Sequence, residues 1–328
     1  MKKIITTATP QRISFAGGGT DINYFYEKHG GLVLSTTIDK FIYVTVKVHN
    51  ELFKKKYRLN YSITEHADTL DEIKNDIIRE SIRFLGIEEP LYISSASDLP
   101  ALSGLASSSC FAVGLLSALH QLKGDHVSIA QIAEEACHIE IDVLKKPIGK
   151  QDQYAAAFGG LNLFRFNKNG TVQLTPVTNE NITFILENSL LFYTDIQRSA
   201  DEVLSHQKNS FGTNEKNLLE IKNLAVDFYD VVNKHKLQLD KLGDLLHQNW
   251  LSKKALSQKV SNNLIDEYYQ TALSNGALGG KILGAGGGGF LFLIANKKDH
   301  IKICKSLKSL SVVDFTFEPV GTRTLLNF

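Results

Sequence analysis

A loop of small residues that leads directly into an apolar helix constrains the fold most strongly. Residues 103–109 read SGLASSS, and the segment from Phe111 to Leu119 is almost wholly apolar. We expect a buried helix over 108–122, because its apolar residues cover more than one face. A buried helix holds its N-terminus rigidly, so the loop offers backbone N–H groups, hydroxyls and the positive end of the helix dipole. These features are typical of a phosphate site, although a serine N-cap among tightly packed small residues explains the same pattern.

The order of the expected elements predicts an α+β fold. Strands are expected over 3–16, 31–48, 91–96, 161–167, 171–177, 190–195 and 312–319 and on both sides of a glycine run at 284–289; helices are expected over 69–85, 108–122, 128–144, 149–158 and 298–309, with three or four more between 199 and 276. Strand-rich and helical stretches therefore follow each other in blocks, which favours α+β over a doubly wound sheet. A length of 328 residues favours two domains. We place them at 1–185 and 186–328.

Three consecutive glycines, Gly17 to Gly19, follow the first expected strand, and Thr20 and Asp21 follow them. Turns seldom need three glycines, so we expect the backbone there to approach another group closely.

The glycine run at 284–289 formally satisfies G-x-G-x-x-G, but the segment after it, FLFLIA, is typical of a strand. A dinucleotide site needs a helix at that place, which disfavours a Rossmann oxidoreductase. A Walker A motif is absent, because Ile282 follows Gly280 and Lys281.

Two acidic residues stand out in the middle of the chain. Glu140 lies in an otherwise apolar helix pattern, where a carboxylate needs a partner, a metal or the surface. Asp152 begins a very apolar helix, where it could simply complement the helix dipole. His138 and Glu140 resemble half of a zinc-deaminase signature, but no C-x-x-C follows, so we reject that interpretation.

Composition excludes several classes of partner. The formal net charge is +1 and 22% of residues are charged, so we expect neither nucleic acid nor a membrane as partner. The apolar run after the N-terminal lysines is too short for a signal peptide. Three scattered cysteines, Cys110, Cys137 and Cys304, favour a reducing compartment. We therefore expect a cytoplasmic protein, and the sequence leaves its oligomeric state open.

Three motifs, taken in order, resemble those of the GHMP kinase superfamily, which includes galactokinase, homoserine kinase, mevalonate kinase and phosphomevalonate kinase. Residues 10–21 resemble its P-x-R segment with a glycine turn, residues 100–109 its P-x-x-x-G-L-x-S-S-x loop, and residues 281–289 its C-terminal glycine run. The resemblance covers essentially the whole chain. It implies the GHMP kinase fold, with an N-terminal ribosomal-protein-S5-domain-2-like domain and a C-terminal ferredoxin-like α+β domain.

The resemblance also implies an ATP-dependent kinase with named site residues. Asp152 matches the catalytic aspartate and Arg12 its basic partner. Ser108 and Glu140 match the Mg²⁺ ligands, and Asp21 matches a ligand of a sugar hydroxyl. The ATP phosphates are expected on the loop made of Gly104, Leu105, Ala106, Ser107, Ser108 and Ser109. In the sugar-kinase branch the glutamate precedes G-x-x-D-Q by about a dozen residues, and here Glu140 lies twelve residues before Asp152.

Within the superfamily, the phrase RISFAGGGTD and the segment HGGLVLSTTIDKFIYVTV resemble the D-glycero-D-manno-heptose 7-phosphate kinases. That resemblance implies phosphorylation at C1 to give the 1,7-bisphosphate, used for nucleotide-activated heptose and surface polysaccharide. The residues expected near the substrate are Gly18, Gly19, Thr20, Asp21, Arg198, Lys281, Gly286 and Gly287. Arg198 and Lys281 are the candidates for its phosphate, with help from Lys145, Lys146 and Lys150.

Other functions remain open at this point. Another GHMP sugar kinase, similar to galactokinase or fucokinase, is the nearest alternative. Galactokinases, however, place Glu-His where this chain has Gly18 and Gly19. A non-catalytic sugar sensor on the same fold is a second alternative, although all the expected catalytic residues are present. The exact sugar, anomer and hydroxyl cannot be read from the sequence.

Overall fold

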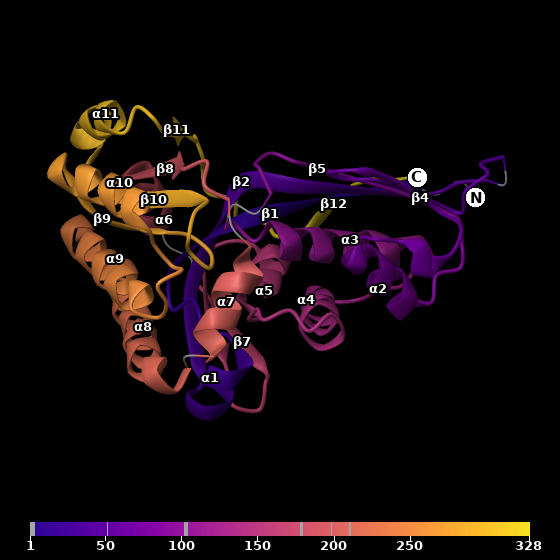
Figure 1. Ribbon diagram of the computed structural model, residues 1–328, viewed down its shortest axis with the longest axis horizontal. Coiled ribbons are helices and arrows are strands. Elements are labelled where there is room, and N and C mark those ends of the chain that lie inside the picture. Colours follow the sequence, from indigo (N-terminus) through magenta and orange to yellow (C-terminus); the bar gives the residue numbers. More distant parts are fainter. Residues whose placement is uncertain (1–3, 51, 102–103, 178–179, 198, 210) are drawn as a thin grey trace.

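Two β-sheets and the helices packed on them form the molecule (Figure 1). The computed structural model describes residues 4–50, 52–101, 104–177, 180–197, 199–209 and 211–328. The predicted α+β architecture is confirmed.

The first sheet is built on two long antiparallel strands, β1 (Ile4–Ala16) and β2 (Gly31–Val48). β2 pairs with β5 (Leu91–Ser97) along its second half and with β6 (Asn162–Phe166) along its first residues. The remaining strands of this sheet are β3 (Tyr57–Asn60), β4 (Thr64–Ala67), β7 (Val172–Pro176) and β12 (Arg323–Asn327).

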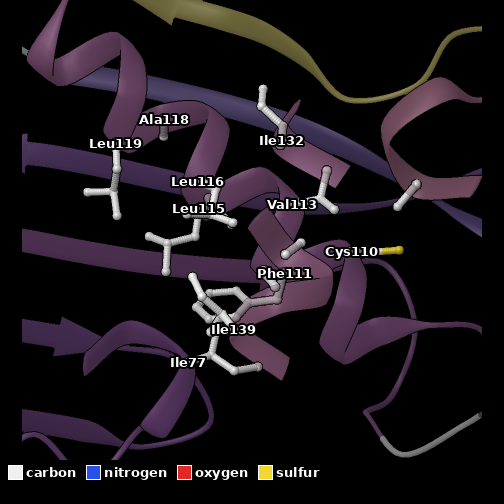
Figure 2. Packing of buried hydrophobic residues seen from close by; sticks show 14 of the residues in the cluster. Ile77, Cys110, Phe111, Val113, Leu115, Leu116, Ala118, Leu119, Ile132 and Ile139 are labelled. Atoms are coloured by element: carbon white, nitrogen blue, oxygen red, sulfur yellow. The ribbon is translucent and has the colours of Figure 1, made fainter. Parts of the chain in front are cut away.

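The predicted buried helix is α3 (Ser107–Lys123), in which every residue from Cys110 to Leu119 is buried. It packs on β1 and β2, next to α5 (Gln151–Phe158), while α2 (Asp76–Leu85) and α4 (Ile129–Cys137) cover its other sides. Figure 2 shows Phe111 and Leu115 of α3 among apolar side chains of neighbouring helices, including Ile77 and Ile139. Packing on several sides holds the N-terminus of α3 in place.

The second sheet has the strand order β11-β8-β10-β9 and is antiparallel throughout. Its strands are β8 (Ser189–Tyr193), β9 (Ala277–Ile282), β10 (Phe290–Ala295) and β11 (Ser311–Val312), and the helices of this part are α7 (Ala200–Asn209), α8 (Phe211–Val232), α9 (Leu239–Lys254), α10 (Asn263–Ser274) and α11 (Lys297–Ser306). The predicted strand–turn–strand over the glycine run is confirmed, because β9 and β10 pair with each other across it.

An apolar core joins the two sheets. Phe15, near the end of β1, stacks on Phe228 of α8 with ring centroids 5.3 Å apart, and its ring lies 5.9 Å from that of Phe292 in β10. All three side chains are fully buried. The cleft described below is therefore built on a packed junction between the sheets. The proposed boundary between residues 185 and 186 stays a prediction.

The predicted last strand, 312–319, is wrong. Only Ser311 and Val312 pair as a short strand, and Phe317 forms one isolated bridge with Ile38. Pro319 has no N–H to donate, and the last strand is instead β12, which returns to the first sheet and pairs with β1.

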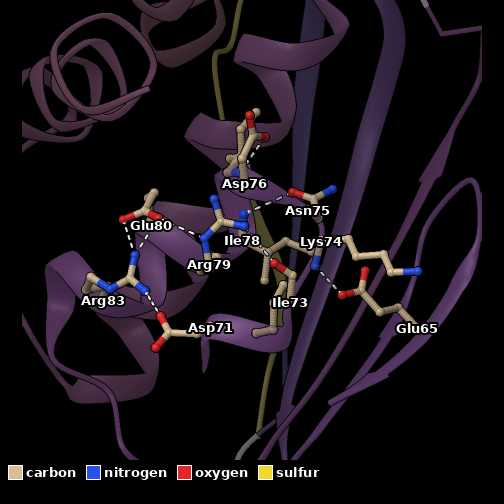
Figure 3. A network of polar contacts seen from close by, with 11 residues as sticks. Glu65, Asp71, Ile73, Lys74, Asn75, Asp76, Ile78, Arg79, Glu80 and Arg83 are labelled. Carbon is tan, nitrogen blue, oxygen red and sulfur yellow. Dashed lines mark hydrogen bonds and ion pairs between the residues drawn. The ribbon is translucent and has the colours of Figure 1, made fainter. Parts of the chain in front are cut away.

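The predicted helix over 69–85 is also shorter than expected. A 3₁₀ turn covers Leu70–Glu72, and α2 begins only after Asn75, whose side chain accepts a hydrogen bond from the Ile78 N–H at 3.0 Å. Figure 3 shows this cap and the Glu80–Arg83 ion pair of the same helix. The Asn75 side chain caps the start of α2, because its oxygen takes the place of a backbone acceptor for the first turn. The helix therefore does not extend back to residue 69.

The predicted helix over 128–144 changes its winding halfway. α4 ends at Cys137, and a π-helical segment, η2 (His138–Val143), follows and carries Glu140. The sequence patterns also missed two short helices, α1 (Asn23–His29) and α6 (Asn181–Glu187), and the strands β3 and β4. Among the described residues, no helix is both long and apolar enough to cross a bilayer.

Candidate active site

A cleft of about 290 Å³ opens where the first sheet, the N-terminus of α3 and the second sheet meet. All three glycine- or serine-rich stretches line it. The sequence-predicted residues in its wall are Arg12, Gly18, Gly19, Asp21, Gly104, Ala106, Ser107, Ser108, Ser109, Glu140, Lys146, Asp152, Lys281 and Gly286. Residues from distant parts of the chain therefore meet as the motif order predicted.

A few predicted residues lie behind the cleft wall. Leu105 is fully buried in the core between the sheets. Gly287 donates its N–H to the Val260 carbonyl at 2.7 Å, which fixes the glycine loop from behind. Arg198 lies outside the described residues.

The glycine turn before Asp21 has a separate reason for each of its residues. At Gly17, φ is 92° and a Cβ would lie 1.9 Å from the Leu32 carbonyl oxygen, so only glycine fits. At Gly19, φ is 97°, in the left-handed region. Thr20 is fully buried, and its hydroxyl donates to the Gly17 carbonyl at 2.7 Å, so it holds the turn. At Gly18, which lines the cleft, a Cβ would have its nearest neighbour at 3.5 Å, an ordinary van der Waals distance, so sterics do not require glycine there.

Arg12 and Asp152 form a two-pronged ion pair at the centre of the cleft. Nε and Nη2 of Arg12, on β1, donate to the two carboxylate oxygens of Asp152, in the first turn of α5, at 2.7 and 2.8 Å. Nη1 of Arg12 donates to the Gly104 carbonyl at 2.8 Å. Arg12 is buried, whereas the Asp152 side chain keeps 25% of its surface exposed. The arginine therefore fixes the orientation of a carboxylate that still faces the cleft.

Asp21 is a second carboxylate of the same wall, and among the described residues backbone N–H groups alone donate hydrogen bonds to it. It accepts hydrogen bonds from the N–H groups of Gly19 at 2.9 Å and Gln151 at 3.1 Å. A Cβ at Gly149 would lie 2.0 Å from its Oδ2, so the loop before α5 packs directly on the carboxylate. Burial, with a smaller effect from the charge of Asp152, raises the pKa of Asp21 to about 6.

Glu140 is fully buried, and three side chains donate hydrogen bonds to its carboxylate. The hydroxyls of Ser108 and Ser109 and the side-chain amide of Gln153 each donate to it at 2.7 Å. Lys146 lies 3.7 Å away. Burial raises the pKa of Glu140, and the positive charge of Lys146 and the three hydrogen bonds oppose that effect. The π-helical winding of η2 places this carboxylate against the N-terminus of α3.

The start of α3 keeps the features expected of a phosphate site. Ala106, the N-cap residue, has a left-handed φ of 70°, and in the part of the chain that the structure describes no side chain caps the helix. The alternative of a serine N-cap is therefore not what the described residues show. The Ser107 hydroxyl accepts from the Gln11 side chain at 2.9 Å, and the hydroxyls of Ser108 and Ser109 turn to Glu140. The first backbone N–H groups of α3 are left to face an anion.

The donor set suits Mg²⁺ only together with a phosphate ligand. Ser108 and Glu140 offer one hydroxyl and one carboxylate at the same wall of the cleft. Among the described residues, no group of three or more His, Cys, Asp or Glu side chains is placed to hold a metal ion, so the site shows no metal cage made of these side chains alone. Mg²⁺ commonly takes one or two protein oxygens and completes its shell with phosphate oxygens and water, which fits this arrangement.

Two polar side chains next to Gly18 escaped the sequence analysis. Ser14 Oγ and Gln151 Oε1 are buried atoms without a hydrogen-bond partner among the described residues, and both residues line the cleft. A Cβ at Gly18 would lie 3.5 Å from Ser14 Oγ and 3.6 Å from Gln151 Nε2. Serine and glutamine on a strand and at a helix start carry no signal of this role, since only the fold brings them together.

Lys253 of α9 also escaped the sequence analysis, because a lysine near the end of a helix reads as an exposed residue. Lys253 is buried and lines the cleft, and so does the predicted Lys281 of β9. Lys253 donates to the carbonyls of Ile282 and Gly284, and Lys281 to the carbonyl of Phe15 at 3.1 Å.

The second and third motifs touch each other at the edge of the cleft. A Cβ at Gly104 would lie 2.7 Å from the Leu283 carbonyl oxygen, and a Cβ at Gly284 would lie 2.5 Å from the Gly104 Cα. Both positions have a positive φ. Glycine is therefore needed on each side, and the two loops close against one another without side chains.

Comparison with known proteins identifies relatives of the chain. Residues 69–160 match the model for the GHMP kinases N terminal domain, and residues 233–309 match that for GHMP kinases C terminal. The D-glycero-alpha-D-manno-heptose 7-phosphate kinase of Campylobacter jejuni is 33% identical over 98% of this chain and 99% of its own. A galactokinase of Pyrococcus furiosus is 26% identical over 89% of both chains.

Solved structures show the same fold. The crystal structure described as a D-glycero-D-manno-heptose 1-phosphate kinase from Bacteroides thetaiotaomicron superposes with a TM-score of 0.79 over 99% of both chains, at 23% identity. A galactokinase of Lactococcus lactis complexed with galactose gives a TM-score of 0.76 at 17% identity. At these sequence identities the superpositions show a shared fold, and nothing about the function follows from them.

Proposed function

The chain belongs to the GHMP kinase superfamily, as an ATP-dependent sugar kinase of that group, and on this premise we propose that it phosphorylates D-glycero-D-manno-heptose 7-phosphate at C1. The product is the 1,7-bisphosphate, a precursor for nucleotide-activated heptose of surface polysaccharides. The observation that carries the proposal is the 33% identity over nearly the full length of both chains to a heptose 7-phosphate kinase.

We assign the nucleotide phosphates to the N-terminus of α3. Its uncapped N–H groups and the positive end of the helix dipole attract the β- and γ-phosphates. Ser108 and Glu140 are the oxygen ligands that would hold Mg²⁺, which when bound neutralises charge on the phosphate oxygens. Ser109 and Gln153 keep Glu140 in place through hydrogen bonds.

We assign the chemistry to Asp152 and Arg12. Asp152 accepts the proton of the anomeric hydroxyl while that oxygen bonds to the γ-phosphorus, and the bond from phosphorus to the β–γ bridging oxygen breaks, which releases ADP. An anomeric hydroxyl is more acidic than an ordinary alcohol, so an ordinary carboxylate suffices as base. The Arg12 guanidinium fixes the direction of Asp152 and adds positive charge near the transferred group.

The sugar is expected over the glycine turn. Asp21, oriented by two backbone N–H groups, accepts a hydrogen bond from a sugar hydroxyl. Ser14 Oγ and Gln151 Oε1 have no hydrogen-bond partner among the described residues, and sugar hydroxyls would satisfy them. Because Gly18 has no side chain, the turn leaves room for a sugar larger than a hexose.

A substrate panel tests the proposal. The purified protein is incubated with MgATP and heptose 7-phosphate, unphosphorylated heptose, galactose, fucose or mevalonate, and ADP release is followed. We expect the highest kcat/KM for heptose 7-phosphate, with ³¹P spectra that show a new phosphate at C1. A higher kcat/KM for galactose or fucose would instead favour the alternative of another sugar kinase, and no turnover of any sugar would favour a sensor.

A further inference from the structure

Two lysine side chains are buried in the cleft wall, close enough that the charge of one acts on the other. Lys253 is 7% exposed and Lys281 is 2% exposed. Lys253 donates to two backbone carbonyls of the third motif, one of them Ile282 at 3.0 Å. Lys281 donates to the carbonyl of Phe15 at 3.1 Å and to the side-chain oxygen of Asn249 at 3.3 Å. An ammonium group has three N–H donors, so each lysine keeps one that these bonds do not use.

In the described part of the chain, no negative charge offsets the burial of these two lysines. All their assigned hydrogen-bond acceptors are neutral oxygens, and among the described residues no carboxylate forms an ion pair with either lysine. The charges that act on Lys253 and Lys281 are those of Arg12 and, for Lys281, of Lys253, and both repel. Asp152 already pairs with Arg12. Burying two cations beside a third is unfavourable unless an anion joins them.

The pKa values reflect the same lack of compensation. Burial, with repulsion from Arg12, lowers the pKa of Lys253 to about 7. Burial also lowers the pKa of Lys281 well below its usual range. An anion bound between the two groups would restore their protonated forms, so binding of the anion and uptake of protons are coupled.

We propose that Lys253 and Lys281 form a phosphate-binding subsite of the cleft, in addition to the N-terminus of α3. The two lysines lie on α9 and on β9 of the second sheet, whereas α3 packs on the first sheet. Two buried ammonium groups with one free donor each suit the oxygens of a phosphoryl group.

Two phosphoryl groups of the proposed reaction could occupy the subsite. Lys281 donates a hydrogen bond to the carbonyl of Phe15, which lies two residues before the glycine turn over which the sugar is expected. The phosphate that the sugar already carries is therefore one source of the bound phosphoryl group. Lys253 bonds the carbonyl of Gly284, which packs on Gly104 of the nucleotide loop, so the γ-phosphoryl of ATP is the second source. The identity of the sugar phosphate rests on the proposed function, but the subsite itself does not.

The only tryptophan of the chain reports on this place. Trp250 is fully buried and lies three residues before Lys253 on α9, so the two residues share a face of the helix. Its fluorescence is titrated with inorganic phosphate, heptose 7-phosphate, unphosphorylated heptose and a non-hydrolysable ATP analogue with Mg²⁺. The proteins compared are the wild type, Lys253→Met, Lys281→Met and the control Lys241→Met, whose lysine is exposed on the same helix.

We expect each of the two buried-lysine variants to bind inorganic phosphate at least about tenfold more weakly than wild type, and Lys241→Met to bind it normally. Weaker binding of heptose 7-phosphate, with unphosphorylated heptose unaffected, identifies the sugar phosphate as the occupant. Weaker binding of the ATP analogue alone identifies the γ-phosphoryl. Unchanged affinity for all four ligands in both variants overturns the proposal.

Stability separates ligand binding from a structural role. Methionine removes an uncompensated buried charge and keeps most of the apolar stem, so the melting temperature without ligand should stay equal or rise. If the lysines only fasten the third motif, the melting temperature falls and phosphate affinity stays unchanged. Should a variant fail to fold, the wild type alone still decides: no phosphate-specific fluorescence change, compared with chloride at equal ionic strength, overturns the subsite. Lack of activity on heptose 7-phosphate would remove the proposed substrate and leave these titrations interpretable.

Discussion

At the scale of single residues, the two carboxylates of the cleft differ in what holds them. An arginine fixes Asp152 with two hydrogen bonds, whereas in the part of the chain that the structure describes only backbone N–H groups bond to Asp21. Arg12 fixes the direction of the Asp152 carboxylate, whereas Asp21 has no charged partner among the described residues and its pKa is raised by burial. The two residues therefore suit different tasks, proton acceptance for Asp152 and sugar binding for Asp21.

Asp152→Asn should abolish turnover, by about a hundredfold or more, because an amide cannot accept the hydroxyl proton. The amide has nearly the same size, so nucleotide binding should remain. ADP release with heptose 7-phosphate measures the first effect, and Trp250 fluorescence with the ATP analogue measures the second. Turnover at the wild-type rate would remove Asp152 from the proposed mechanism.

The pKa of Asp21, raised to about 6, predicts the acidic limb of the pH profile. Below this pH Asp21 is increasingly protonated and accepts the hydrogen bond from the sugar hydroxyl less well. We therefore expect kcat/KM for the sugar to fall up to tenfold per pH unit. The pKa of Glu140 is raised as well, but its protonation should weaken MgATP binding instead. Profiles measured separately for each substrate distinguish the two, and a flat sugar profile between pH 5 and pH 7 would contradict the assignment of Asp21.

At the scale of secondary-structure elements, loops and helix starts carry the site, and glycines set how closely they approach. The loop before α5 packs on Asp21 through Gly149, and the second and third motifs touch through Gly104 and Gly284. A rigid scaffold of β1, β2 and α3 holds these loops. Small changes of backbone volume should therefore act on substrate binding before they act on folding.

Gly149→Ala should raise KM for the sugar at least about tenfold, because the new Cβ would lie 2.0 Å from Asp21 Oδ2 and must displace it. Gly212→Ala is the matched control, since Gly212 lies in α8 away from the cleft wall and no described atom lies within 4 Å of the position of its Cβ. Steady-state kinetics with varied sugar and saturating MgATP give both KM values. Equal KM values for the two variants would show that the close packing on Asp21 is unimportant.

At the scale of the whole molecule, the last strand of the chain pairs with the first. β12 pairs with β1 through residues 323–327, and the hydroxyls of Thr322 and Thr9 lie 2.8 Å apart. The core between the sheets adds Phe15, Phe228 and Phe292 to this connection. The proposed division into 1–185 and 186–328 thus places strands of one sheet on both sides of the boundary.

Deletion of residues 322–328 should lower the free energy of unfolding by at least about 2 kcal/mol, because β1 loses the backbone hydrogen bonds of an edge strand. The control Phe328→Ala keeps the backbone and changes a side chain that is 76% exposed, so it should unfold like the wild type. Urea unfolding followed by circular dichroism measures both. An unchanged midpoint in the deletion variant would mean that β12 contributes little to the fold.

Much of the site could be predicted from local patterns. The apolar segment after SGLASSS predicted the burial of α3, and the strand pattern after the glycine run predicted β10 instead of a Rossmann helix. Both are short-range signals, read from periodicity and from residues that permit or forbid a backbone conformation. Other features were missed for lack of such a signal. Lys253 has the sequence context of an exposed helical lysine, and the π-helical winding at Glu140 leaves the helical pattern nearly unchanged.

The sequence by itself determined the α+β class, the three loop motifs and their order, and the identity of the charged residues that could do the chemistry. Only the tertiary structure decided which of them meet. It paired Arg12 with Asp152, returned the last strand to β1, and buried Lys253 and Lys281 without a counter-charge from any described residue. The physical reason is range: propensity and steric limits act between neighbours in the chain, whereas burial and charge pairing arise only after distant segments have packed.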